Sequence, residues 1–352
     1  MTISRFTYEG VPARVVFGSG ARQGLADELD RLGLSQVVLI ASGSLRAEAD
    51  ALAAALDNRL TWRVHGVRRH VPADLAEEVA ADAGRVGADG VVTLGGGSVT
   101  GLGKALALRG LPLVAVPTTY AGSEMTPVWW ITSNGRRETG RDTRVLPRAV
   151  IYDPELTQGL PPLLTAASGM NALAHCLEAL WAAGASPFSA PLALDGARAL
   201  CEALPAAVAE PLDLKARSRA LVGAGQAGMA LATAGAGLHH RLCHELGSRY
   251  DLPHAQTHAA LLPHVVGFNE TVLGALAARM AVAVGTGRAS TGVHDLAVRM
   301  GLSMALSELG MPESGIAEVA ADVAADPPPN PRPLDDADLR SLLRAAWEGD
   351  GP

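Results

Sequence analysis

The feature that most constrains the fold is a regular alternation of short apolar runs with helical stretches, which lasts until about residue 155. Residues 36–41 (QVVLIA) form a continuous apolar run, as expected of a strand buried on both faces of a parallel sheet. Strands that alternate with helices predict such a sheet with right-handed crossovers. The expected strands are 14–17, 36–41, 61–67, 90–94 and 113–116, and the expected helices are 24–32, 45–56, 75–86 and 100–107.

The remainder of the chain is rich in alanine and leucine and almost lacks β-branched runs. Hydrophobic residues make up 48% of the sequence but aromatic residues only 4%, which favours closely packed helices. A chain of 352 residues exceeds the usual size of a single core. We therefore expect a dinucleotide-binding α/β domain at 1–157 and an all-helical substrate and catalytic domain at 158–352. The main helices are expected at 166–183, 192–208, 212–233, 272–284 and 336–347.

Charge and cysteine content exclude several classes of protein. The net charge of −7 argues against a nucleic-acid partner. No apolar stretch resembles a signal peptide or is long enough to span a bilayer, so no membrane partner is expected. Three cysteines without paired spacing indicate reduced thiols. The sequence thus predicts a soluble, cytoplasmic protein.

A glycine-rich turn directly follows the strand at 90–94 and precedes a helix. Backbone N–H groups at such a turn can bind a pyrophosphate. The turn after the second strand carries no carboxylate for a ribose hydroxyl and has Arg46 nearby, so either NADH or NADPH is the expected cofactor. A second pattern, Gly18-x-Gly20 with Gly24, is one residue too long for a dinucleotide motif. The expected cofactor contacts are Ser42, Gly43, Gly95, Gly96, Gly97, Ser98, Thr118 and Thr119.

Histidines are concentrated late in the chain, where six of the ten fall between positions 239 and 264. His240 and His244 share a helix face, and so do Asn171 and His175. Imidazoles bind divalent metals, but an amide at position 171 is a poor ligand. The cluster could instead bind a substrate carboxylate, donate a proton or stabilise an oxyanion. The expected catalytic residues are His175, His240, His244 and His254, and the expected substrate contacts include Asn171 and His258.

Longer stretches carry a family resemblance. They include TLGGGSVTGLGKALALRGLPLVAVPTTYAGSEMTPVW (93–129), SGMNALAHCLEALWA (168–182) and GLHHRLCHELGSRYDLPHAQTHAALLPHVVGFN (237–269). With TGRDTRVLPRAVIYDPELT (139–157) and NPRPL…AWEG (330–349), they cover most of the chain in the right order. The chain resembles the iron-containing alcohol dehydrogenase superfamily, and within it the maleylacetate reductases.

The resemblance implies a Rossmann-like N-terminal domain, a helical C-terminal domain and an active site in the cleft between them. It assigns the glycine turn and the threonine pair to the cofactor, and Arg137 to a position where relatives have a cofactor-contacting lysine. His244 matches a further active-site histidine. Four residues match the metal-ligand positions of metal-dependent relatives: Asn171, His175, His240 and His254.

Two departures from the family pattern remove negative charge. Asn171 replaces an aspartate ligand, and Gly101 replaces the aspartate of the GGGSxxD motif. Both suit a dianionic substrate, and both are found in maleylacetate reductases. The resemblance therefore implies metal-independent, NADH- or NADPH-dependent reduction of maleylacetate to 3-oxoadipate by a homodimer. The remaining candidates for contact with the dicarboxylate substrate are Tyr120, Arg141 and Arg144. The two arginines are expected in a loop at 139–144.

Other functions remain open at this point. A metal-dependent alcohol or aldehyde reductase, or a reductase of another oxo-diacid, would share most of these features. A nucleotide-binding protein without activity would not need the histidine cluster. A lyase similar to dehydroquinate synthase would need a metal and more basic phosphate-binding residues.

Overall fold

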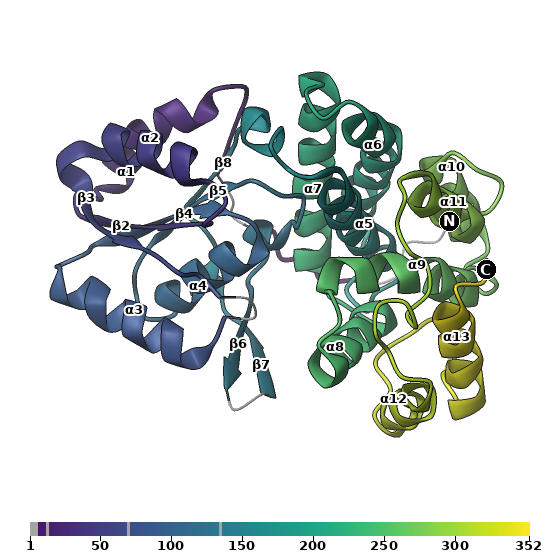
Figure 1. Ribbon diagram of the computed structural model, residues 1–352. Helices are drawn as coiled ribbons and strands as arrows, with labels where there is room; N and C mark the ends of the chain where they lie inside the picture. Colours follow the sequence, from purple (N-terminus) through teal and green to yellow (C-terminus); the bar gives the residue numbers. More distant parts are fainter. Residues whose placement is uncertain (1–5, 12–13, 69–70, 134–135) are drawn as a thin grey trace. The chain divides into compact units, whose positions relative to one another are not determined.

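The computed structural model describes residues 6–11, 14–68, 71–133 and 136–352, except the side chains of Arg136 and Arg137. The chain divides into two compact units (Figure 1). One unit comprises Val11–Leu160, and the other comprises Pro161–Pro352 together with the described residues before Val11.

The first unit is built on a parallel sheet, as predicted, and the sheet has six strands, one more than the five expected. Its strands lie in the order β1-β8-β5-β4-β2-β3. From β2 the chain first adds β3 on one side and then β4 on the other, so the strand order reverses between β2 and β4. Open parallel sheets bind ligands at the carboxyl ends of the strands at such a reversal. The strands are β1 (Val15–Phe17), β2 (Val37–Ala41), β3 (Leu60–Val64), β4 (Gly90–Gly95), β5 (Leu113–Pro117) and β8 (Ala149–Tyr152).

Helices cover both faces of this sheet. On one face, α1 (Leu25–Leu32) and α2 (Arg46–Leu56) contribute to an apolar cluster with Leu39 of β2. On the other face, α3 (Ala73–Arg85) and α4 (Gly97–Ala107) pack against the alternate residues of β2 (Figure 1). The apolar run predicted from the sequence is thus buried on both sides.

A separate hairpin joins β6 (Val128–Ser133) to β7 (Arg136–Arg141). From the sequence we predicted that Arg141 lies in a loop. This prediction was wrong, because Arg141 pairs with Val128 at the end of the hairpin. The side chain of Trp129 on β6 lies directly against Gly140 on β7. A Cβ atom at position 140 would lie 2.5 Å from Cζ2 of Trp129, so this packing depends on the glycine.

The second unit is helical, as predicted. Its central helix, α5, is buried on every side from Thr165 to Ala179 and packs against α6, α7 and α9. Small residues allow this packing, since a Cβ atom on Gly196 would lie 2.9 Å from Sγ of Cys176. The helices are α5 (Pro162–Ala179), α6 (Ala190–Ala209), α7 (Leu214–Ala234), α8 (Leu238–Tyr250), α9 (His254–Glu270), α10 (Ala275–Val284), α11 (Ala289–Arg299), α12 (Ser314–Ala325) and α13 (Asp336–Glu348).

In the part of the chain that the structure describes, no single helix is long and apolar enough to cross a membrane. The pair α7 and α8 reaches that length and composition only when taken together, with a bend of 101° between the two helices.

Candidate active site

The predicted glycine turn lies between β4 and α4, where the strand ends at Gly95 and the helix begins at Gly97. A Cβ atom would lie 2.7 Å from Val99 Cγ2 if placed on Gly95, and 2.8 Å from Thr119 Cγ2 if placed on Gly96. On Gly97 it would meet nothing closer than 3.9 Å. The first two glycines are therefore required by packing, whereas the third leaves open space at the start of α4, where anions bind favourably.

The predicted cofactor contacts come from three neighbouring strand ends. The backbone N–H of Thr118 donates to the carbonyl of Gly95 at 3.2 Å, and the N–H of Ser42 donates to the carbonyl of Leu94 at 2.9 Å. The turns after β2, β4 and β5 thus lie side by side at the reversal of strand order. The side chain of Arg137, the remaining predicted contact, lies outside the described residues.

The second glycine pattern, Gly18-x-Gly20 with Gly24, has a structural role. The carboxylate of Asp153 accepts hydrogen bonds from the backbone N–H groups of Gly20 (3.1 Å) and Arg22 (3.3 Å), and it also pairs with the Arg22 guanidinium at 2.5 Å. A phosphate at this turn would have to displace the buried carboxylate. This agrees with the motif spacing, which is wrong for a dinucleotide.

Gly101 has a packing reason of its own. A Cβ atom at this position would lie 2.8 Å from Val71 Cγ2 and 3.6 Å from Cζ2 of Trp130. The hairpin and the segment before α3 thus fill the space that an aspartate side chain would need.

Lys104 is a fully buried residue whose role we did not predict from the sequence. Its ammonium group donates to the carbonyls of Ser123 (2.6 Å), Thr126 (2.8 Å) and Val128 (2.7 Å). Burial lowers the pKa of Lys104 to about 7 and nearby Glu124 opposes the shift, while the three carbonyl acceptors favour the charged form. This lysine fixes the segment that follows the threonine turn. The one signal in the sequence is that Lys104 follows the glycine turn closely, and this position would have suggested a phosphate ligand and not a structural role.

The predicted substrate contacts in this unit lie in different surroundings. Tyr120 is fully buried, and its hydroxyl donates to Oγ1 of Thr157 at 3.4 Å. Arg144 is exposed and forms an ion pair with Asp142 at 2.6 Å. Arg141 lies at the end of β7. Their contact with a substrate stays a prediction.

In the helical unit, α5, α8 and α9 bring the predicted histidines together. His175 and His240 stack with their ring centroids 5.0 Å apart, and His244 stacks on His254 at 6.2 Å. His258 connects the two pairs, because its ring lies 5.1 Å from that of His240 and 4.5 Å from that of His254. The helical spacing read from the sequence therefore corresponds to one continuous cluster.

Several polar atoms of the cluster have no hydrogen-bond partner among the described residues: Asn171 Oδ1, His175 Nδ1, His240 Nε2 and His258 Nε2. Burial lowers the pKa of His175 and of His258 well below the ordinary value, and neighbouring histidines lower both further. These two imidazoles are therefore neutral. Buried polar groups normally find a partner, so the open atoms indicate a site for a polar ligand or water.

Glu178 on α5 is a carboxylate that contacts the cluster. It is fully buried, accepts the backbone N–H of His239 at 2.7 Å and contacts Nδ1 of His240. Burial alone would raise its pKa, but the facing imidazoles of His240 and His239 lower it below the ordinary value. An ionised Glu178 requires His240 to carry a proton on Nδ1. The sequence offered one signal, the position of Glu178 one helical turn after His175.

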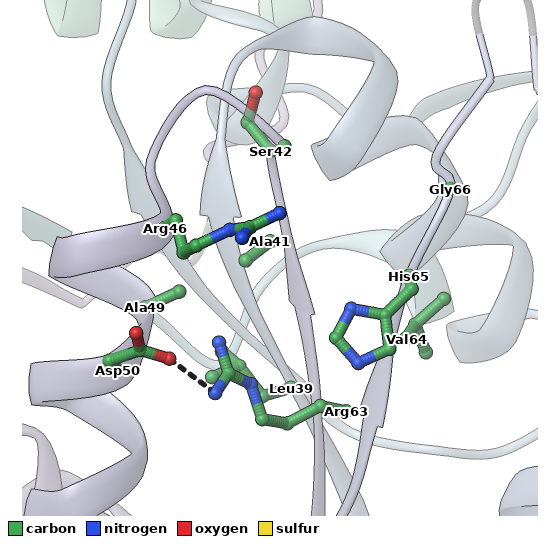
Figure 2. A pocket seen from close by; sticks show the side chains of 11 residues that line it. Leu39, Ala41, Ser42, Arg46, Ala49, Asp50, Arg63, Val64, His65 and Gly66 are labelled. Carbon is green, nitrogen blue, oxygen red and sulfur yellow. Dashed lines mark hydrogen bonds and ion pairs between the residues drawn. The ribbon is translucent and has the colours of Figure 1, made fainter.

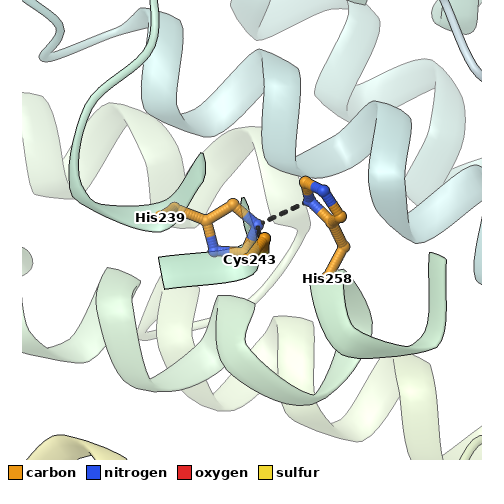
Figure 3. Close-up of side chains that lie close together, drawn as sticks. All are labelled: His239, Cys243 and His258. Carbon is orange, nitrogen blue, oxygen red and sulfur yellow. Dashed lines mark hydrogen bonds between the residues drawn. The ribbon is translucent and has the colours of Figure 1, made fainter. Parts of the chain in front are cut away.

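A second group of metal-type ligands consists of His239, Cys243 and His258 and so shares His258 with the cluster; Figure 3 shows these three side chains. His239 Nε2 and His258 Nδ1 are hydrogen-bonded to each other at 2.9 Å, and Sγ of Cys243 lies 3.6 Å from the former. Burial raises the pKa of the Cys243 thiol well above its ordinary value. The two imidazoles thus satisfy each other through one hydrogen bond.

The four positions that match ligands in metal-dependent relatives do not reproduce their donor set. They offer three imidazoles and the amide oxygen of Asn171, with no carboxylate. The nearby carboxylate of Glu178 faces His240 and the start of α8 instead. These residues do not fit a tightly held divalent ion of the carboxylate-and-histidine type.

Comparison with known proteins agrees with this geometry. Residues 12–154 match the iron-containing alcohol dehydrogenase model, and residues 165–347 match the C-terminal model of the Fe-containing alcohol dehydrogenase family. The chain belongs to the iron-containing alcohol dehydrogenase family. It is therefore a nicotinamide-dependent oxidoreductase, and the resemblance seen in the sequence is confirmed.

Similar proteins within the family share a name. The chain is 47% identical to a maleylacetate reductase of Burkholderia cepacia, over 99% of this chain and 100% of that protein. It is 44% identical to one of Sphingobium indicum, over 98% of both chains. The crystal structure of a maleylacetate reductase from a Rhizobium species superposes with a TM-score of 0.95 at 44% identity, covering 99% of this chain and 100% of that one.

Proposed function

We propose that this protein reduces the carbon–carbon double bond of maleylacetate to give 3-oxoadipate, with NADH or NADPH as the hydride donor. The similarity to maleylacetate reductases over nearly the full length supports the substrate. The single structural observation that carries the proposal is the buried histidine cluster without a carboxylate ligand, because it offers polar groups but no anionic ligand for a metal.

The chemistry follows from the substrate, an alkene conjugated to a ketone and flanked by carboxylates. Hydride from the dihydronicotinamide adds to the alkene carbon β to the ketone, and the π electrons move onto the ketone oxygen to form an enolate. A proton then adds to the carbon α to the ketone. Two electrons and one proton come from the cofactor, and the second proton comes from a protein group or water.

The histidine cluster is suited to the enolate and its protonation. Hydrogen bonds to developing negative charge lower the barrier. We assign hydrogen-bond donation to the enolate to three imidazoles of the cluster, His175, His244 and His254. His240 is oriented by Glu178 through Nδ1, and Asn171 and His258 line the same group.

Metal independence is part of the proposal. A divalent ion in a relative would polarise the ketone oxygen, and here neutral hydrogen-bond donors take that role. The carboxylates of the substrate are assigned to Tyr120, Arg141 and Arg144. We further propose a homodimer in the cytoplasm, consistent with three cysteines that form no disulfide.

Isotope transfer tests the proposed reaction. Cofactor carrying deuterium at C4 of the dihydronicotinamide should place one deuterium on the carbon β to the ketone of 3-oxoadipate, as read by NMR of the product. Deuterium recovered instead on a carbinol carbon would mean that the ketone is reduced, as an alcohol dehydrogenase would do, and would overturn the proposal.

A further inference from the structure

A cavity of about 400 Å³ lies beside the turn that follows β2. Figure 2 shows that its walls come from the end of β2, the first turns of α2 and the end of β3. Its volume is within the range of small-molecule sites. Because the N–H of Ser42 bonds to the end of β4, the cavity adjoins the glycine turn at the reversal of strand order.

The side chains that line this cavity include two arginines but one carboxylate. Arg63 and Asp50 neutralise each other through an ion pair of 2.6 Å, drawn as a dashed line in Figure 2. The guanidinium of Arg46 points into the same space and forms no ion pair or side-chain hydrogen bond with any described residue. The cavity therefore keeps one uncompensated positive charge, with the Ser42 hydroxyl and His65 also on its wall.

We propose that Arg46 binds the 2′-phosphate of the cofactor whose adenosine contacts Ser42 and Gly43 in this cavity, so that NADPH is the favoured hydride donor. The proposal rests on the nicotinamide dependence of the proposed function and goes further by assigning the phosphate contact. An arginine can bind a phosphate through two parallel hydrogen bonds. Arg46 is also the first residue of α2, where the backbone favours an anion.

The alternative, an adenosine with a free 2′-hydroxyl, requires a carboxylate acceptor at the strand end. No carboxylate occurs in the turn after β2, where the chain reads Ser42-Gly43-Ser44. Asp50 is the only carboxylate that lines the cavity among the described residues, and it is already paired with Arg63. The polar groups of the cavity thus favour a phosphate over a hydroxyl.

Binding of cofactor fragments tests this assignment without turnover. Calorimetry on the full chain would compare 2′,5′-ADP with 5′-AMP, which differ only in the 2′-phosphate. We expect 2′,5′-ADP to bind about 10-fold more tightly or better, and we expect Arg46→Ala to remove that preference. The control is Arg85→Ala, which removes an exposed arginine paired with Asp82 on α3 and should keep the preference.

Equal affinity of the two fragments for the unaltered protein would overturn the assignment, as would a preference that survives in Arg46→Ala. The ratio of NADPH to NADH affinity should fall in the same variant by about 10-fold. Because fragment binding does not involve maleylacetate, a failure of the proposed substrate would leave this result standing, and the two failures remain distinguishable.

Discussion

Replacing Glu178 by glutamine is expected to destabilise the helical unit and to slow turnover. The side chain is fully buried, and its carboxylate receives the N–H of His239 and Nδ1–H of His240. A glutamine oxygen can keep the first bond, but its NH2 group would then face His240. One charge-assisted hydrogen bond is lost, which costs about 2 kcal/mol. For a unit of this size we expect the melting temperature to fall by roughly 4–8 °C.

The effect on activity follows from the proton of His240. When an NH2 group faces Nδ1, that atom must accept, so the proton of the neutral ring moves to Nε2. His240 then no longer carries on Nδ1 the proton that Glu178 accepts in the parent protein. Groups that orient an active-site histidine typically contribute about 10- to 100-fold to activity, and we expect kcat to fall by that factor. Nitrogen NMR of the histidines would show the change of tautomer directly.

Glu124→Gln is the matched control. Glu124 is also fully buried, but its partner is Tyr152, which donates to it at 2.6 Å, and a glutamine oxygen can accept the same hydrogen bond. It should change stability and kcat little. If Glu178→Gln left kcat within about twofold of the parent, or kept the His240 proton on Nδ1, the assigned role of Glu178 would be refuted.

Further predictions concern the sheet unit. Gly96→Ala should lower thermal stability, because its Cβ atom would meet Thr119 at 2.8 Å, whereas Gly97→Ala should leave stability intact and weaken cofactor binding, measured by fluorescence titration. Equal stability of the two variants would contradict the packing argument. The pKa of Glu28 is lowered from 4.5 to about 2, chiefly by the hydrogen bond from Arg14. The contribution of Glu28 to the stability of the folded protein is therefore present above pH 4.5 and is lost as the pH falls to about 2. The melting temperatures of Glu28→Gln and the parent should therefore converge over that range, and a constant difference would disprove the linkage.

Much of the fold could be predicted because each element carries its own periodicity. The apolar run of β2 and the glycine turn after β4 both specify local structure, and the predicted helices at 192–208 and 212–233 lie within about two residues of α6 and α7. The hairpin β6–β7 and the strand β8 were not predicted. β8 has only four residues, and the hairpin depends on the contact of Trp129 with Gly140, which no local pattern shows.

The candidate site was predictable in composition but not in its connections. Helical spacing placed His240 and His244 on one face, yet only the packing of α5, α8 and α9 shows that His258 joins the two stacked pairs. Glu178 is a single acid in an alanine-rich helix, and its role depends on contact with the start of α8, sixty-one residues away. Such pairings arise from tertiary structure, which spacing along the chain does not encode.

The most direct test of the central claim is the rate at which the purified protein oxidises NADPH or NADH in the presence of maleylacetate, with and without EDTA. Rapid oxidation that EDTA does not slow, with 3-oxoadipate as the product, is the result predicted for a metal-independent reductase of this enone. Activity that EDTA abolishes and a divalent metal restores would contradict the interpretation of Asn171. Absence of turnover with maleylacetate would contradict the substrate assignment itself.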